Sequence, residues 1–359
     1  MTKDIDSKSG KIIGILGGGQ LGSMLAIAAS KLGLKTHIYS SSKDSPAFNY
    51  STKYTIADYD DEIALKNFIK EIDIATIEFE NIPEQTLNYI SDYVPLYPNK
   101  ESIFLSQDRF LEKNFIRENS IDVADFMPIN NIDDIKKWDF NLRPGILKTR
   151  KFGYDGKGQK IVTTAKMCEK YFIEMNNSPC IIEEVVPFNM EVSTITARSQ
   201  DGSIEMFEPS RNIHKNHILH TSNIPSGLSN ALIEKLHAIS KLIISKLNYI
   251  GVLSIEFFIT NNNIMVNEIA PRVHNSGHWT MDGANISQFE QHIRAISNLP
   301  IVEPKTLHSL EMLNIIGNDI YYWEKSNDNE VRKIHIYGKK GIKSGRKLGH
   351  VNSIKKSKS

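Results

Sequence analysis

The sequence predicts an α/β protein with more than one domain, and three observations support this class. The chain has 359 residues, whereas a single domain usually holds roughly 100 to 200, so two or three domains are expected. It begins with an apolar run, a glycine-rich turn, a helical pattern and a second apolar run, which is the order of a βαβ unit. Further along, β-like runs come in pairs around turn residues, which is typical of antiparallel hairpins.

The N-terminal domain is predicted to be a Rossmann-like parallel sheet with its helices, over residues 1–105. Residues 1–10 form a polar leader, and a strand, a helix and a second strand follow it. Later β-like runs and a helical stretch extend the sheet. In chain order, these elements are expected at Lys11–Leu16, Leu21–Leu32, Lys35–Tyr39, Glu62–Ile72, Ile74–Phe79 and Val94–Tyr97.

The rest of the chain is predicted to form a central domain over residues 106–300 and a small β-rich C-terminal domain over residues 301–359. In the central domain two helical stretches are separated by hairpin-forming β runs. These elements are expected at Gln107–Glu118, Gly145–Lys148, Gln159–Val162, Ile181–Val186, Ala231–Leu247, Val252–Thr260 and Ile264–Ile269.

The composition excludes several classes of function. Lys and Arg number 43 against 42 Asp and Glu, so no overall positive field would bind nucleic acid or an anionic membrane. Cys168 and Cys180 are too few for a disulfide framework and too far apart for a C-x-x-C motif, which favours a reducing, cytoplasmic location. No apolar run approaches the roughly 20 residues of a membrane span, and the N-terminus is too polar for a signal peptide.

The first glycine-rich turn has the spacing G-x-G-x-x-G at Gly17, Gly19 and Gly22, after a strand and before a helix. A dinucleotide site also needs an acidic residue about 20 positions later, at the end of the second strand, to bind the ribose. That strand ends in Tyr39 followed by serines. We therefore favour another ligand near the helix N-terminus over NAD, with tight packing of strand against helix as the structural alternative.

The second glycine-rich segment lies between two β runs. It follows Lys148 and reads G-Y-D-G-K-G-Q from Gly153 to Gln159. Glycines around a lysine allow backbone N–H groups and charge to surround phosphates, although the segment is not a Walker A loop. The alternative is an ordinary flexible hairpin tip.

A pair of glutamates predicts a metal site. Glu256 and Glu268 are equally distant from Asn262, the centre of an asparagine-rich turn, so a symmetric hairpin places them opposite each other. Opposed carboxylates repel and call for a cation between them. Mg²⁺ takes one or two protein carboxylates together with phosphate oxygens, and Asn267 could add a further oxygen. The alternative is a solvated pair, against which the apolar flanking residues count.

The loop Pro271–Thr280 follows directly and holds more polar donors than a connection needs, including Arg272, His274, Asn275 and Ser276. Beside a metal–nucleotide site, such donors suit the capture of a small anion. His274 and His278 have the spacing of a zinc-finger pair, but no cysteine pair accompanies them, so zinc is not favoured.

A basic stretch near the C-terminus contains Lys339, Lys340, Lys343, Arg346 and Lys347, interleaved with glycines. Such a run is often a solvated surface. The glycines favour instead a backbone that folds around a phosphate.

Taken together, the motifs G-G-G-Q-L-G, E-F-E-N-I-P, F-G-Y-D-G-K-G-Q and N-E-I-A-P-R-V-H-N-S-G-H-W-T resemble the N5-carboxyaminoimidazole ribonucleotide synthetase family, a branch of the ATP-grasp enzymes. The likeness runs from about Lys11 to Asn352. It implies an ATP-grasp fold for the central domain, with two lobes that close on ATP.

The resemblance also implies roles for individual residues. The implied ATP contacts are Arg109, Lys148, the loop residues Gly153, Tyr154, Asp155, Gly156, Lys157, Gly158 and Gln159, the adenine linker Glu183, Glu184, Val185 and Val186, the ribose ligand Glu191, and His214, with Glu256 and Glu268 as magnesium ligands beside Asn267. The implied ligands of bicarbonate and the ribonucleotide are Gln20, Leu21, Glu78 or Glu80, Arg272, His274, Asn275, Ser276, Lys339 and Arg346. The resemblance implies catalytic roles for Lys148, Arg272 and His274.

The implied reaction is the carboxylation of aminoimidazole ribonucleotide with ATP and bicarbonate, through carboxyphosphate, in purine biosynthesis. The implied cofactor besides ATP is Mg²⁺, with Mn²⁺ as a substitute. A homodimer, and a separate mutase that takes the product, are further expectations. The nearest alternative is another ATP-grasp ligase that acts on a different amine-bearing nucleotide; a non-catalytic or NAD-binding module would leave the glutamate pair and the second glycine-rich segment unexplained.

Overall fold

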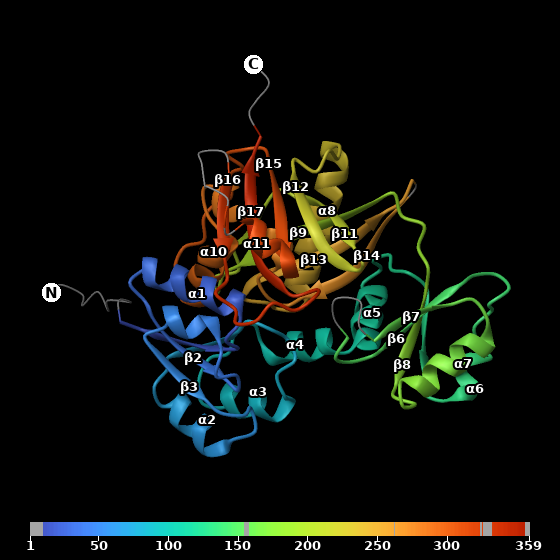
Figure 1. Ribbon diagram of the computed structural model, residues 1–359, viewed down its shortest axis with the longest axis horizontal. Coiled ribbons are helices and arrows are strands. Elements are labelled where there is room, and N and C mark those ends of the chain that lie inside the picture. The colour runs from blue at the N-terminus through green and yellow to red at the C-terminus, as the bar shows by residue number, and fades with distance from the viewer. Residues whose placement is uncertain (1–9, 154–157, 262, 324, 326–331, 356–359) are drawn as a thin grey trace.

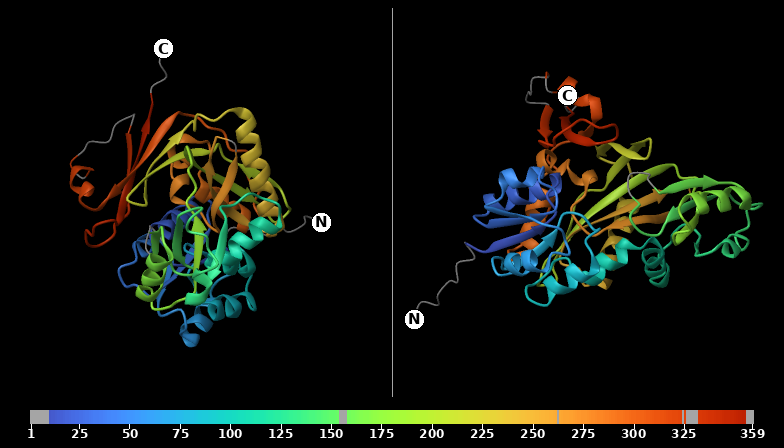
Figure 2. Two further views of the ribbon diagram at one scale, coloured as in Figure 1. Left: turned by 90° about the vertical axis from the view of Figure 1, so that its right-hand side faces the viewer. Right: turned by 60° about the horizontal axis from the view of Figure 1, so that its bottom comes forward.

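The computed structural model describes residues 10–153, 158–261, 263–323, 325 and 332–355. Three sheets organise these residues (Figure 1). The N-terminal sheet and a small four-stranded sheet stand at opposite ends of the molecule, and the large sheet lies between and above them (Figures 1 and 2). Among the described helices, none is both long and apolar enough to cross a membrane.

The N-terminal domain confirms the predicted βαβ unit. Its four strands are parallel in the order β3-β2-β1-β4. The elements are β1 (Ile12–Leu16), α1 (Gln20–Lys31), β2 (Lys35–Ser40), η1 (Pro46–Tyr50), β3 (Lys53–Ile56), α2 (Glu62–Ile69), β4 (Ile74–Ile77) and α3 (Glu84–Ser91). The short edge strand β3 and helix α3 were not predicted. A full strand at Val94–Tyr97 was wrong, because only Leu96 forms a bridge, to Ala75.

The small sheet has the order β5-β8-β6-β7 and carries α6 and α7 (Figure 1). Its elements are β5 (Phe126–Ile129), α6 (Ile132–Ile135), β6 (Gly145–Thr149), β7 (Gln159–Val162), α7 (Ala165–Glu174) and β8 (Cys180–Glu184). The predicted antiparallel hairpin is confirmed, with Lys148 paired to Gln159. Two helices, α4 (Lys100–Gln107) and α5 (Arg109–Glu118), lead into this sheet where one was predicted, because Asp108 between them has extended backbone.

The large sheet has nine strands, ordered β14-β13-β9-β11-β12-β15-β17-β16 with β10 beside β9. The strands are β9 (Met190–Arg198), β10 (Ile204–Met206), β11 (Ser210–Lys215), β12 (Ile218–Ile224), β13 (Gly251–Ile259), β14 (Ile264–Ala270), β15 (Leu310–Ile316), β16 (Arg332–Ile336) and β17 (Lys347–Ile354). The helices that follow these strands are α8 (Asn230–Lys246), α9 (Thr280–Gly283), α10 (Gln288–Ile296) and α11 (Ile320–Trp323), with the short turns η2 (Asn275–Gly277) and η3 (Gly317–Asp319). Because β15 pairs with β12, the C-terminal strands continue the central sheet; the domain boundaries near residues 105 and 300 stay predictions.

The hairpin β13–β14 has the predicted pairing at the glutamates but not the predicted symmetry. Glu256 lies opposite Glu268, whereas Ile259 pairs with Ile264, so the register is shifted by one residue toward the tip. The shift lies between Glu256 and Phe257 and leaves Asn267 as the extra residue of a bulge. The bulge restores the opposition of the two carboxylates that a symmetric turn at Asn262 was expected to give; Asn262 itself lies outside the described residues.

His292 of α10 ties the N-terminal domain to the large sheet. Its Nδ1 accepts a hydrogen bond from the backbone N–H of Val252 on β13 at 3.0 Å, and its Nε2 lies 2.9 Å from Oγ1 of Thr76 on β4. Because Nδ1 accepts, Nε2 carries the proton and donates to Thr76. Burial lowers the pKa of His292 to about 3, so the ring is neutral at physiological pH.

Two substitutions at His292 test this tie. Leucine leaves the Val252 N–H without an acceptor, whereas the Oδ1 atom of asparagine can take the place of Nδ1. We therefore expect His292→Leu to lower the free energy of unfolding by about 1 to 2 kcal/mol more than His292→Asn does, although leucine fills more volume. Urea unfolding of both variants measures the difference. Equal stabilities, or a more stable leucine variant, would contradict the tie.

Candidate active site

Helix α5 presents a charged and buried face to the space between the small and the large sheet. The helix begins at Arg109 because the carboxylate of Asp108 accepts a hydrogen bond from the backbone N–H of Phe110 at 3.0 Å. Arg109, Glu112 and Lys113 stand three and four residues apart, so they share one side of the helix. Glu112 and Lys113 are 4% and 2% exposed. Charges buried to this extent need partners.

The partner of Lys113 in the small sheet is Glu183 of β8. One carboxylate oxygen of Glu183 lies 3.2 Å from Nζ of Lys113 and 2.9 Å from Nζ of Lys148 on β6. Burial alone would raise the pKa of Glu183, but Lys113 and Lys148 hold it at about 2. Burial lowers the pKa of Lys148, and Glu183 opposes that shift. Glu183 therefore fixes two ammonium groups at the edge of the site.

The same helix face contacts the hairpin β13–β14. Arg109 forms an ion pair with Glu268 at 3.6 Å, and Lys113 donates to the backbone carbonyl of Asn267 at 3.1 Å. Glu112 accepts a hydrogen bond from the backbone N–H of Ile269 at 3.3 Å. Burial and the nearby Glu268 raise the pKa of Glu112 to about 8. Helix α5 thus joins the two sheets through hydrogen bonds and ion pairs.

The base of the second glycine-rich segment is attached to the start of α5. Arg150 makes two hydrogen bonds to Asp108, at 2.9 and 2.6 Å, and Arg109 donates to the carbonyl of Gly153 at 3.0 Å. At the far end, a Cβ atom on Gly158 would lie 2.7 Å from the hydroxyl of Thr149, so this position needs glycine. The backbone N–H of Thr149 also donates to the carbonyl of Gly158 at 2.9 Å, so the described residues that flank the segment are held on both sides. The predicted phosphate ligands Tyr154, Asp155, Gly156 and Lys157 lie outside the described residues, and Gln159 begins β7.

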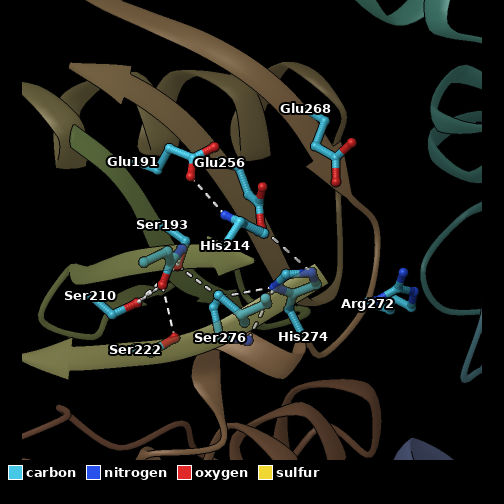
Figure 3. Close-up of polar contacts among 12 residues, drawn as sticks. Glu191, Ser193, Ser210, His214, Ser222, Glu256, Glu268, Arg272, His274 and Ser276 are labelled. Atoms are coloured by element: carbon cyan, nitrogen blue, oxygen red, sulfur yellow. Dashed lines mark hydrogen bonds and ion pairs between the residues drawn. The ribbon is translucent and has the colours of Figure 1, made fainter. Parts of the chain in front are cut away.

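The opposed carboxylates of Glu256 and Glu268 lie on the face of the large sheet that is turned toward α5 and the Arg272 loop (Figure 3). Burial raises the pKa of Glu256 to about 8, and Glu268 adds to the rise. His214 and Lys347 oppose it. Concentrated negative charge of this kind suits a divalent cation. Among the described residues no three His, Cys, Asp or Glu side chains are arranged to hold a metal alone, so phosphate oxygens would complete the coordination.

Glu191 and His214, the predicted nucleotide contacts, lie beside this pair on the neighbouring strands β9 and β11 (Figure 3). The His214 ring nitrogen Nδ1 is 2.7 Å from a carboxylate oxygen of Glu191. Burial alone would lower the pKa of His214, but this hydrogen bond and the nearby Glu256 raise it. The predicted adenine linker, residues 183–186, spans the end of β8 and the start of the connection to β9, between the two sheets. It contains Glu184, Val185 and Val186, of which Glu184 is 3.4 Å from Arg143.

Arg272 and His274 enter the site from the loop after β14. The guanidinium of Arg272 meets the carboxylate of Glu80 in a two-bond contact, 2.6 Å from Nε and 3.2 Å from NH2. Burial and the charge of Arg272 lower the pKa of His274 well below its usual value, so its ring is neutral. Asn275 is 7% exposed, and both polar atoms of its amide lack a partner among the described residues. An unpaired buried amide of this kind is available to a ligand.

Glu78 fills the anion site of the first glycine-rich turn. Its two oxygens accept from the backbone N–H groups of Gly19 at 2.5 Å and Gly22 at 2.9 Å, at the N-terminus of α1. A Cβ on Gly17 or Gly19 would lie 2.2 or 2.5 Å from this carboxylate side chain. The glycines therefore admit a side chain of the same protein, and the pyrophosphate of a dinucleotide has no place there. Gln20 begins α1 beside this turn.

Two predicted substrate contacts have other roles in the described structure. Leu21 is 7% exposed and its side chain packs in the hydrophobic core. Arg346 donates to the carbonyls of Lys340 and Gly341, at 2.5 and 3.1 Å, and so closes its own loop. Lys339, whose Nζ donates to the carbonyl of Lys347 at 3.1 Å, lies on the same loop.

Sequence reasoning missed three charged residues of this site, namely Glu112, Lys113 and Lys347. For Glu112 and Lys113 the sequence predicts a helix. Their spacing from Arg109 shows that they share a face of that helix with it, but not that this face is buried. Lys347 was noted in the basic stretch without a role. In the structure its charge acts to lower the pKa of both Glu256 and His274, so Lys347 lies within electrostatic reach of the site.

Models of known domains match three parts of the chain. A ribonucleotide synthetase preATP-grasp domain matches residues 10–107, an ATP-grasp domain matches residues 114–289, and a phosphoribosylaminoimidazole carboxylase C-terminal domain matches residues 311–359. N5-carboxyaminoimidazole ribonucleotide synthase of Brucella melitensis is 40% identical, over 97% of both chains.

Solved structures give the same result. The ADP complex of an N5-carboxyaminoimidazole ribonucleotide synthetase has a TM-score of 0.92 at 38% identity, over 97% of this chain and 93% of that one. An Aspergillus clavatus N5-carboxyaminoimidazole synthase in complex with ADP and 5-aminoimidazole ribonucleotide has a TM-score of 0.89 at 26% identity, over 97% and 94%. With this identity along nearly its whole length, the chain belongs to the N5-carboxyaminoimidazole ribonucleotide synthase family of ATP-grasp ligases.

Proposed function

We propose that this protein carboxylates the exocyclic amine of 5-aminoimidazole ribonucleotide with ATP and bicarbonate, and releases ADP, phosphate and N5-carboxyaminoimidazole ribonucleotide. Its membership of the family is the first support. The observation that carries the proposal for this chain is the opposed pair Glu256 and Glu268, with the partly buried Lys148 on one side and the Arg272 loop on the other. A metal–triphosphate site and an anion site thus meet in one place.

The nucleotide would bind between the two sheets. Lys148, Arg109 and the segment Gly153–Gln159 would hold the phosphates, and Glu191 and His214 the ribose side. Glu256 and Glu268 would hold Mg²⁺, or Mn²⁺ in its place, and the bound ion would neutralise charge on the transferred phosphoryl group. The raised pKa of Glu256 fits this assignment, because a cation between the carboxylates would relieve their repulsion.

The proposed chemistry has two steps. A bicarbonate oxygen attacks the γ-phosphorus of ATP, the bond to the β-phosphate oxygen breaks, and carboxyphosphate and ADP form. The amine nitrogen then attacks the carboxyl carbon, either of carboxyphosphate or of CO₂ released from it. The bond from that carbon to the phosphate oxygen breaks, phosphate leaves, and the departing phosphate takes the proton that the amine loses. Arg272, His274 and Asn275 would hold the anionic oxygens, since a fixed guanidinium and unpaired N–H groups stabilise such charge in a site that excludes water.

The ribonucleotide would lie between the N-terminal turn and the C-terminal basic loop. Lys339 would contact its phosphate. Arg346 would stabilise the same loop through its hydrogen bond to the carbonyl of Gly341. The sequence did not decide whether Glu78 or Glu80 contacts the substrate. In the structure Glu80 accepts a hydrogen bond from Arg272, and Glu78 accepts one from the backbone of Gly19. Both would therefore orient hydrogen-bond donors around the substrate. The C-terminal loop is joined to the N-terminal domain by an ion pair at 2.6 Å between Lys340 and Asp44.

Several expectations rest on the resemblance alone. They are the homodimer and the transfer of product to a separate mutase. The expected cytoplasmic location rests instead on the low cysteine content. The competing function is ligation of a different amine-bearing nucleotide by the same ATP-grasp chemistry. No observation in this chain favours it over aminoimidazole ribonucleotide.

The first expected result is a substrate-dependent release of ADP. Purified protein with Mg-ATP and bicarbonate should release ADP at least about ten-fold faster when aminoimidazole ribonucleotide is added. The reason is that a bound acceptor amine is positioned to react with carboxyphosphate as soon as it forms. Omission of bicarbonate should remove the stimulation. If the protein binds ATP but the ribonucleotide does not change the rate of ADP release, the acceptor is another amine.

The second expected result concerns the glutamate pair. Glu256→Gln and Glu268→Gln should each lower turnover by at least about 100-fold, because each removes one charge from the cation site. Thermal unfolding should show an intact fold, since each change relieves repulsion between the carboxylates. Glu205→Gln on β10, which lies outside the site, serves as control. Wild-type turnover in both glutamine variants would refute the metal assignment.

A further inference from the structure

Ser276 fixes the orientation of the His274 ring through contacts with its Nδ1 atom. The backbone N–H of Ser276 donates to Nδ1 of His274 at 3.3 Å, and the Ser276 hydroxyl lies 2.9 Å from the same nitrogen. A backbone N–H can only donate, so Nδ1 must offer a lone pair. A neutral imidazole carries one proton, which is therefore on Nε2.

A chain of buried polar side chains sets the direction of the second hydrogen bond (Figure 3). The hydroxyl of Ser222 donates to Oδ1 of Asn212 at 2.8 Å, and Nδ2 of Asn212 donates to Ser193 at 2.9 Å. Ser193 donates to the hydroxyl of Ser276 at 2.7 Å. A side branch is formed by Ser210, whose hydroxyl lies 2.9 Å from that of Ser193 and 3.3 Å from Oδ1 of Asn212. The oxygen of Ser276 then accepts from Ser193, which leaves its own proton for Nδ1 of His274. All members of this chain are buried, with exposures between 0% and 4%.

The other edge of the ring faces the proposed site. Nε2 of His274 lies 3.8 Å from a carboxylate oxygen of Glu256. The backbone of His274 is held on both sides by Gln288, which accepts from its N–H at 2.9 Å and donates to its carbonyl at 2.6 Å. The fixed backbone holds the ring in place, and the ring cannot turn over without breaking the hydrogen bonds to Ser276.

We propose that the chain Ser222–Asn212–Ser193–Ser276 locks His274 in the tautomer with its proton on Nε2. His274 is then a neutral hydrogen-bond donor to the anionic oxygens of bicarbonate or carboxyphosphate, and not a general base. This assignment of a role rests on the proposed function. Nε2 already carries a proton and cannot remove one from bicarbonate or the amine. Ser193 and Ser276 are then positioning residues, which act only through His274.

The tautomer can be read directly from NMR spectra of the full-length protein labelled with ¹⁵N in its histidines. The His274 signals are identified by their loss in His274→Gln. We expect the pattern of a protonated Nε2 and a hydrogen-bonded, unprotonated Nδ1. A protonated Nδ1 would overturn the proposal. This measurement needs no turnover, so it stands even if aminoimidazole ribonucleotide is not the acceptor.

A matched pair of variants tests the chain. Ser193→Ala removes the donor that orients Ser276, whereas Ser240→Ala removes a hydroxyl that is equally buried but bonded to Thr194 on the other face of β9. In Ser193→Ala, the Nδ1 signal should move toward that of a free acceptor, and kcat/KM for bicarbonate should fall about ten-fold, the effect of roughly one hydrogen bond. Ser240→Ala should change neither. Equal effects in both variants would mean that Ser193 is merely structural.

Side-chain replacements at His274 test its role as donor. The amide nitrogen of glutamine can reach the place of Nε2, whereas asparagine ends near Nδ1. We expect His274→Gln to retain at least about ten-fold more bicarbonate-dependent turnover than His274→Asn, because only glutamine presents an N–H to the anion. Equal losses in the two variants, with ATP binding intact, would contradict a donor role.

Discussion

The buried charged face of α5 is the constraint on which the site depends. Arg109, Glu112 and Lys113 lie where the small and the large sheet come together. The charges of the buried Lys113 and the partly buried Arg109 are tolerable there only while their partners stay in place. The partners are the Glu183–Lys148 pair on one side and the hairpin with Glu268 on the other. A shift of either sheet would leave a buried charge unpaired, so these contacts fix the position of the small sheet relative to the large one, between which we propose that the nucleotide binds.

Much of this arrangement was predictable from local patterns. The glycine spacing predicted the βαβ unit, and the run around Lys148 predicted an antiparallel hairpin; both are confirmed. The opposition of Glu256 and Glu268 was also predicted, although the symmetric turn was only part of the reason. The bulge at Asn267 could not be foreseen, because it depends on the pairing of β14 with β13 and on contacts from α5, which is far away in the sequence. Lys113 donates to the backbone carbonyl of that bulged residue.

The contacts missed by sequence reasoning join segments far apart in the chain. Glu78 was expected near the substrate, but no local pattern indicates that its carboxylate caps α1 at Gly19 and Gly22. The pairing of β15 with β12, which makes the C-terminal strands part of the central sheet, is equally non-local. A glycine or a helical spacing of apolar residues predicts the structure of its own segment only. Partners more than 50 residues away are chosen by the whole fold, as with Gly19 and Glu78.

The affinity of the Lys113→Met variant for Mg-ATP, measured by calorimetry, tests the role of α5 most directly. Without Lys113, the charge of Glu183 is balanced by Lys148 alone, and the carbonyl of Asn267 loses its donor. We expect binding at least about ten-fold weaker than in the wild type, while Lys166→Met on the exposed side of α7 leaves it unchanged. Wild-type affinity in a folded Lys113→Met protein would contradict the account.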